Sequence, residues 1–147
     1  GGLGLRGGVS RLGHCTASDH EGLVVAWLWF ESAGVFSHQT ALSLHGLSDA
    51  LPGQLHLTLP AGWRRRRFRV PKDVVLHHAD IPAEERAWFG PVPITSPSRT
   101  LSDCAREPIA PDLLRQASQQ AVRRGLVTKT DLRVVERALE PFGGLAA

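Results

Sequence analysis

Ser37-His-Gln-Thr-Ala-Leu-Ser-Leu-His-Gly-Leu47 has the pattern of one short helix, and both of its ends are marked by residue type. Ser37 is a preferred N-cap residue, and Gly46 can adopt the left-handed conformation that closes a last turn. Projected at about 100° per residue, His38 and His45 fall on the same arc as the apolar side chains. Because a buried imidazole needs hydrogen-bond partners, the pattern predicts that both histidines tie this helix to neighbouring elements.

Three later stretches have strand patterns. Leucines alternate with polar residues over 54–59, as in a half-buried strand. Residues 73–79 alternate in the same way, and the segment between these two stretches is predicted to be a solvated hairpin connection. Residues 90–95 contain two prolines, so this third strand is expected at an edge of the sheet.

An apolar helix is predicted before the central stretch, over residues 18–34. Ser18 and Glu21 have the spacing of a capping box, and Gly34 supplies a stop. Residues 23–30 are apolar on all sides, so this helix is expected in the core, with coverage by a partner as the alternative.

Three helices are predicted after the strands. Ser96 and Pro97 begin the first, in which Arg99 and Asp103 lie one turn apart and can form an ion pair. The other two, over residues 112–124 and from residue 128 onward, have the outline of a helix-turn-helix or of a helical hairpin that covers the sheet. The predicted fold class is α+β, with a small, mostly antiparallel sheet of about three strands packed with about five helices.

The composition is that of an ordinary globular domain. The chain has 147 residues, of which 42% are hydrophobic and 21% are charged. No apolar run approaches the roughly 20 residues of a membrane span, and no signal peptide is evident, so a cytoplasmic protein without a membrane partner is expected. Cys15 and Cys104 form no C-x-x-C pair and predict neither a disulfide framework nor a thiolate zinc site.

One segment is strongly basic. Its cations are Arg64, Arg65, Arg66, Arg67 and Arg69, beside the aromatic residues Trp63 and Phe68. Guanidinium groups can fork onto phosphates and aromatic rings can stack on bases, so nucleic-acid contact is one interpretation and a solvated loop is the other. The net charge of +3 agrees with an anionic partner. If DNA is bound at the last helix, Lys129 and Arg133 are expected to lead it into the groove.

The residues predict no enzyme. The chain offers no nucleophile with a base, no paired carboxylates placed for a cleft and no phosphate-binding glycine loop. His77 and His78 are adjacent on a strand and point to opposite faces, so they cannot bind one ion together. His56 could join one of them across strands, but no carboxylate or thiolate stands at ligand spacing. No catalytic residue, metal, cofactor or small-molecule substrate is therefore expected.

Three blocks in order, residues 34–60, 75–82 and 92–105, resemble the AbiEi family of abortive-infection antitoxins and related viral-defence regulators. The resemblance covers roughly residues 20 to 140. The matching positions with an expected structural role are Ser37, His38, Thr40, His45, Gly46, Thr95, Pro97, Arg99, Thr100 and Asp103. The resemblance implies a non-catalytic antitoxin that neutralises a cognate nucleotidyltransferase toxin, with no direct contact required. It also implies repression of the operon through DNA when an N-terminal domain is present.

The resemblance divides the chain into two parts. Residues 1–18 are expected to be the glycine-rich remnant of an N-terminal winged-helix domain, with a wing strand over 9–12, and residues 19–147 the antitoxin domain. The chain has no methionine, so a fragment, a processed product or an unusual start codon is expected. The alternative functions are a basic nucleic-acid-binding module, a domain linked to a defence nuclease that this chain is too short to include, and a decayed gene product.

Overall fold

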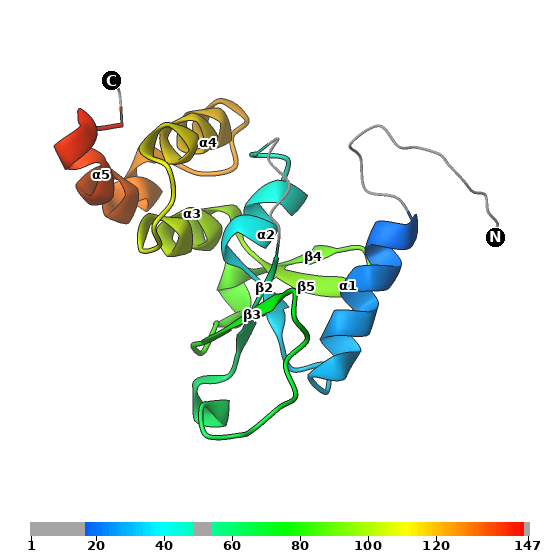
Figure 1. Cartoon of the computed structure of the whole chain (residues 1–147). Coiled ribbons are helices and arrows are strands. Elements are labelled where there is room, and N and C mark those ends of the chain that lie inside the picture. Colours follow the sequence, from blue (N-terminus) through cyan, green and yellow to red (C-terminus); the bar gives the residue numbers. More distant parts are fainter. Residues whose placement is uncertain (1–16, 49–53, 146–147) are drawn as a thin grey trace.

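The computed structural model describes residues 17–48 and 54–145, and Figure 1 shows the arrangement of their helices and strands. The α-helices are α1 (Ala17–Trp29), α2 (His38–Leu44), α3 (Pro97–Ala105), α4 (Pro111–Arg123) and α5 (Arg133–Leu139). The strands are β1 (Val35–Phe36), β2 (Leu55–Leu59), β3 (Val74–His78), β4 (Arg86–Phe89) and β5 (Val92–Thr95). The 3-10 helices are η2 (Ala61–Trp63), η3 (Ala83–Glu85), η4 (Lys129–Leu132) and η5 (Glu140–Phe142). The predicted wing strand at 9–12, most of the predicted N-terminal remnant and most of the turn at 48–53 lie outside the described residues.

The sheet corrects the prediction of about three mostly antiparallel strands. Its five strands lie in the order β3-β2-β1-β5-β4. The pairs β1–β2 and β4–β5 are antiparallel, whereas β1–β5 and β2–β3 are parallel. β1 has two residues and β4 has four, which is too short for an alternating pattern to be recognised in the sequence. The overall class is α+β, but the sheet is larger and mixed.

The connection between β2 and β3 is a crossover, and the predicted hairpin is wrong. The register pairs His56 with Val75 and Thr58 with His77 in parallel. Neighbouring residues in a parallel ladder point to the same face, so His56, Thr58 and His77 share one face of the sheet. The leucines of β2 face the other side, where Leu57 and Leu59 are fully buried.

The predicted edge position of the proline-containing strand is also wrong. β5 lies between β1 and β4, and the edges of the sheet are β3 and β4. Proline has no amide hydrogen to donate to a neighbouring strand. Pro93 is tolerated in β5 because β1 has only two residues and pairs with β5 only through Phe36 and Ile94, so no residue of β1 pairs with Pro93.

Two hydrophobic clusters form the core. One packs α1 against the sheet through Leu23, Ala26, Phe30, Phe36, Leu57, Leu59 and Ile94. The other packs α3, α4 and α5 together through Leu101, Cys104, Leu114, Ala117, Leu132, Val135 and Leu139. The two C-terminal helices therefore pack on α3. The prediction of a helical hairpin that covers the sheet is wrong, because these helices form a separate cluster on the far side from α1 (Figure 1).

Helix α2 belongs to both clusters and joins them. Its Ala41 lies in the sheet cluster and its Leu42 in the helical cluster. The predicted stop is confirmed, because Gly46 has a φ of +72° and the Leu47 amide donates to the Leu42 carbonyl at 3.0 Å. Helix α2, whose ends are marked in the sequence, therefore connects the sheet cluster to the helical cluster.

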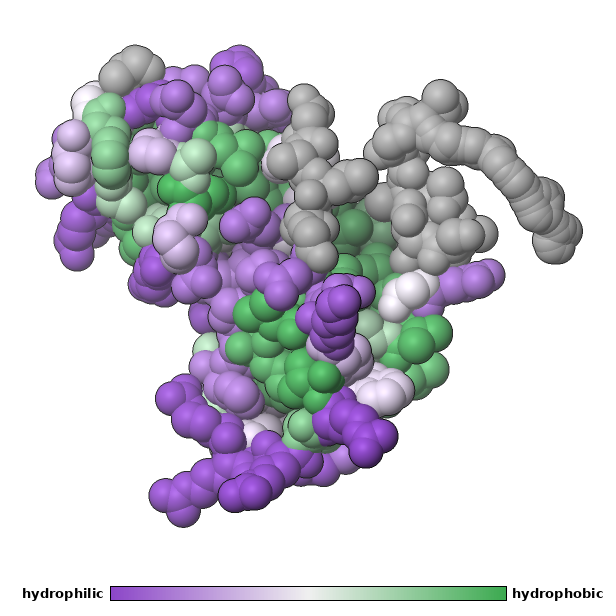
Figure 2. Space-filling model, in the orientation of Figure 1, coloured by the Kyte–Doolittle hydropathy of each residue, from purple (hydrophilic) through white to green (hydrophobic). Residues whose placement is uncertain are grey.

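Helix α1 ends earlier than predicted. It stops at Trp29 because Glu31 and Ser32, each with a φ of 60°, leave the right-handed helical conformation before Gly34 is reached. The capping prediction for Ser18 lies outside the described side chains. Val25, Leu28 and Trp29 remain 61%, 58% and 48% exposed, so the helix is buried on one face only. Figure 2 shows hydrophobic atoms at the surface over this helix.

Candidate functional site

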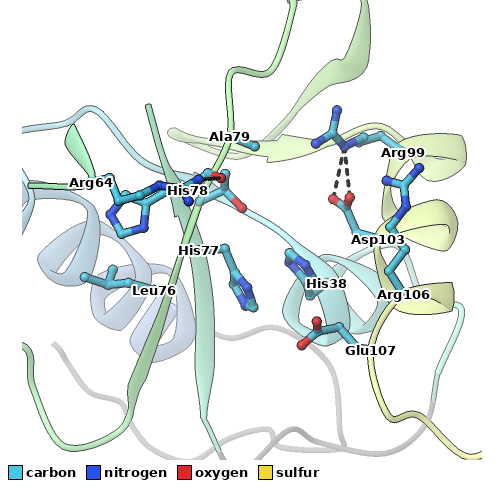
Figure 3. A pocket seen from close by; sticks show the side chains of 11 residues that line it. His38, Arg64, Leu76, His77, His78, Ala79, Arg99, Asp103, Arg106 and Glu107 are labelled. Atoms are coloured by element: carbon cyan, nitrogen blue, oxygen red, sulfur yellow. Dashed lines mark hydrogen bonds and ion pairs between the residues drawn. The ribbon is translucent and has the colours of Figure 1, made fainter. Parts of the chain in front are cut away.

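A polar pocket lies where the sheet meets the helical cluster. Its volume is about 400 Å³, and Figure 3 shows its side chains arriving from β3 on one side and α3 on the other. The lining residues are His38, Thr58, Arg64, Leu76, His77, His78, Ala79, Arg99, Asp103, Arg106 and Glu107. The pocket thus brings together residues from all three blocks of the family resemblance.

Three imidazoles are grouped at this site, and two of them, His38 and His77, line the pocket. The ring of His38 stacks on that of His77, with 3.7 Å between centroids and 14° between planes. Nδ1 of His56 lies 2.9 Å from Nε2 of His77, a hydrogen bond that the parallel register of β2 and β3 makes possible. We call His38, His56 and His77 the histidine cluster.

His38 is positioned by its own neighbours in the chain. Its backbone has a φ of 56°, a conformation that non-glycine residues rarely adopt. Its Nδ1 lies 2.7 Å from the Ser37 hydroxyl, which is also 2.7 Å from the Thr58 hydroxyl. Ser37 occupies the N-cap position as predicted, but its hydroxyl makes no capping bond. The hydroxyl instead makes buried hydrogen bonds with His38 and Thr58.

Burial keeps the histidine cluster neutral. The pKa of His38 is lowered to about 3, mainly by burial and in smaller part by the nearby His77, His56 and Arg99. Burial is also the main reason why the pKa values of His56 and His77 are lowered. At neutral pH each of these rings therefore carries one proton and one nitrogen lone pair.

The second predicted histidine, His45, bonds a different element. Its Nε2 donates to the carbonyl oxygen of Thr95 at 2.7 Å, which fixes α2 to the end of β5. Thr95 and Thr100 add a hydroxyl pair at 2.6 Å, and the Ser96 hydroxyl accepts from the Arg99 amide at 3.4 Å. These family-motif residues hold the start of α3 against the sheet.

The Arg99 and Asp103 pair forms as predicted, but it lies in the pocket wall. Nε of Arg99 donates to both Asp103 oxygens at 3.0 and 3.2 Å, and Nη1 donates to Glu85 at 2.8 Å. Asp103 is only 5% exposed. Its pKa is raised by burial, against the opposing influence of Arg99. Pro97 occupies the first position of α3, where its missing amide is harmless.

Two further motif residues have structural contacts. The Thr40 hydroxyl accepts from the His56 amide at 2.8 Å, which links α2 to β2. Gly46, in the turn after α2, lies beside Arg124, whose guanidinium donates to the His45 carbonyl at 3.0 Å.

The basic residues are divided by the structure. Arg66 is bound to Glu31 at 2.5 Å and covers the ring of Trp63 at 4.0 Å, while Arg64 donates to the His78 carbonyl at 3.3 Å. All five arginines of this segment are exposed, and Figure 2 shows hydrophilic atoms gathered over this loop. Lys129 and Arg133 are also exposed, but α5 lies at the opposite end of the molecule in Figure 1. The two predicted nucleic-acid surfaces are therefore separate.

Glu107 is a site residue that sequence reasoning missed. It lies in the turn after α3, and its carboxylate is grouped with the rings of His38 and His77, with the three potential ligand atoms all within 4.8 Å of one another (Figure 3). These three residues could hold a metal ion. No spacing in the sequence indicates this group, because only the parallel pairing of β3 and the placement of α3 bring its members together.

Comparison with known families matches residues 32–143 to a model described as the AbiEi antitoxin C-terminal domain. The matched range includes all five strands, α2 to α5 and the whole pocket. No curated protein matches the chain. Among the described residues, no helix has the length and apolar character needed to span a membrane.

Proposed function

The chain belongs to the family of the AbiEi antitoxin C-terminal domain, and on that premise we propose that it neutralises a nucleotidyltransferase toxin. The match over residues 32–143 carries this proposal, because it includes the whole sheet and the helical cluster packed on it. The proposed role is non-catalytic, and it does not require a stable complex with the toxin. In a longer protein that adds a DNA-reading domain, we expect repression of the operon as a second role.

Coexpression tests this proposal. The full chain is expressed in bacteria together with the nucleotidyltransferase encoded beside its gene, and growth is measured with the toxin induced. We expect growth to recover with the wild-type chain and not with Leu101→Asp, which places a carboxylate at a fully buried position of the helical cluster. Absence of recovery with a wild-type chain that is expressed and folded would contradict the proposal, as would hydrolysis of DNA by the purified chain.

A second candidate function is contact with nucleic acid through the basic loop. The observation that favours it is the exposure of Arg65, Arg67 and Arg69, whereas Arg66 is engaged by Glu31. When exposed guanidinium groups bind a phosphate backbone, counterions are released from the nucleic acid, and this release favours binding. This contact would supply affinity without sequence specificity.

Salt dependence tests this second function. Binding to a labelled duplex is measured by fluorescence anisotropy at several salt concentrations, for the wild type, Arg65→Ser/Arg67→Ser and Lys129→Ser/Arg133→Ser. The loop variant should reduce the slope of log K against log salt by up to about two, whereas Lys129→Ser/Arg133→Ser should leave it unchanged. If the wild type does not bind duplex at low salt, this function is excluded.

A further inference from the structure

We propose that His38, His77 and Glu107 form a binding site for a divalent transition-metal ion of the zinc type. The potential ligand atoms of these three residues lie within 4.8 Å of one another, at the inner wall of the pocket. Two imidazoles with one carboxylate are a ligand set that zinc accepts, and three protein ligands leave a fourth coordination position free. That position would face the cavity of about 400 Å³.

The hydrogen bonds around the two rings already suit metal binding. A ligand histidine commonly uses its second ring nitrogen to donate to a protein group, which fixes the tautomer. Nδ1 of His38 bonds to the Ser37 hydroxyl, and that hydroxyl can in turn donate to Thr58. This arrangement leaves the lone pair of His38 on Nε2.

His56 has the same relationship to the second ligand. Its Nδ1 lies 2.9 Å from Nε2 of His77, so with the proton on Nε2 the lone pair of His77 lies on Nδ1. His56 therefore acts as a positioning residue rather than as a ligand. The lowered pKa values of all three histidines mean that no proton has to be displaced from a charged imidazolium.

Binding requires a small rearrangement. Zinc–nitrogen bonds of about 2.0–2.1 Å and tetrahedral angles bring neighbouring ligand atoms to roughly 3.3 Å, so the group must contract. The rings of His38 and His77 lie nearly parallel, at 14°, and one of them must turn before both lone pairs can point to one ion. His77 has more room to turn than the buried His38, because β3 is an edge strand and the His77 side chain is only half-buried.

The three ligands come from different parts of the fold. His38 begins α2, His77 lies in β3 and Glu107 follows α3, so an ion would cross-link the sheet to the helical cluster. Because the unfolded chain does not hold these ligands together, binding would stabilise the folded state.

Calorimetry on the untagged, chelator-treated full chain tests the proposal with Zn²⁺ as the probe. We expect one equivalent to bind and the melting temperature to rise. His77→Ala and Glu107→Gln should each weaken binding at least tenfold, and His56→Ala about tenfold through loss of positioning. The matched control is His78→Ala, an adjacent pocket residue outside the ligand group, and it should bind as the wild type does.

Cobalt spectroscopy keeps the test valid if a variant fails to fold. The wild-type chain with Co²⁺ should give intense visible absorption bands, as expected of tetrahedral coordination, and one equivalent of Zn²⁺ should remove them. The proposal is overturned if no Zn²⁺ binds to the wild type. It is equally overturned if folded Glu107→Gln and His77→Ala variants bind Zn²⁺ as tightly as the wild type.

Discussion

His38 and His77 lie face to face, with 3.7 Å between their ring centroids, although one begins α2 and the other lies in the edge strand β3. This contact depends on the parallel pairing of β2 with β3, which places His77 beside Thr58 on the face that α2 covers. Burial keeps the pKa of His38 at about 3, so two uncharged rings meet there without repulsion. The contact between these two rings is therefore polar and uncharged.

Replacing Ser37 should reveal how much stability this contact needs. In Ser37→Ala the buried Nδ1 of His38 and the Thr58 hydroxyl both lose their partner at 2.7 Å. We expect the free energy of unfolding to fall by about 1–3 kcal/mol, measured by urea denaturation with circular dichroism. Ser43→Ala, at a half-buried position of the same helix, should change it by less than about 0.5 kcal/mol. Equal effects of the two substitutions would contradict the role given to the Ser37 hydroxyl.

The Asp103 carboxylate should matter far more than a similar carboxylate at the surface. Asp103→Ala removes the buried acceptor of both Arg99 contacts, and we expect a loss of about 2–3 kcal/mol in urea denaturation. Asp112 also pairs with an arginine within its helix, at 2.9 Å from Arg115, but its side chain is 90% exposed. Asp112→Ala should therefore cost less than about 1 kcal/mol. A larger loss for Asp112→Ala than for Asp103→Ala would refute the argument from burial.

Local signals account for the helices that could be predicted. The glycine after α2, the proline at the start of α3 and the capping box of Thr128 with Asp131 all mark helix ends within a few residues. The alternation of β2 likewise identifies its buried leucines. These features depend on neighbours in the chain, so the sequence contains them directly.

Long-range features could not be predicted in this way. Whether β2 and β3 pair in parallel is decided by how residues 60–73 return along the sheet, and no local pattern records that path. The meeting of Glu107 with His38 and His77 follows from the same topology. The sequence pattern therefore indicates no carboxylate near these histidines, whereas the fold brings Glu107 to them.

Two glycine substitutions should have opposite effects on stability. A Cβ on Gly34 would lie 2.6 Å from Cγ of the fully buried Leu57, so Gly34→Ala should destabilise the fold by about 1–3 kcal/mol. Gly22 lies within α1 with nothing within 4 Å of its Cβ position. Gly22→Ala should raise stability by roughly 0.5–1 kcal/mol, because alanine is the better helix former. Thermal denaturation measures both, and a stabilising Gly34→Ala would show that Leu57 does not occupy this space.

Acid should destabilise the fold, and His45 should contribute to this. Burial lowers the pKa of His45, although its bond to the Thr95 carbonyl raises it, and Arg124 lowers it further. The unfolded chain, whose histidines have a pKa near 6.5, therefore binds more protons than the folded chain as pH falls. The stability that neutral His45 provides is fully present above about pH 6.5 and decreases below it, by at most about 1.4 kcal/mol per pH unit.

His45→Gln isolates this contribution. Glutamine keeps a hydrogen-bond donor but does not titrate. The slope of the unfolding free energy against pH, between pH 7 and pH 5, should therefore decrease by up to the contribution of one proton, about 1.4 kcal/mol per pH unit. The remaining slope comes from His38, His56 and His77, whose pKa values are also lowered by burial. Urea denaturation at each pH, in the presence of a chelator, measures the slope, and the difference between the two proteins at pH 8 reports any loss of packing. If His45→Gln has the wild-type slope, His45 takes up its proton equally well in the folded chain, and its burial against Thr95 has no electrostatic consequence.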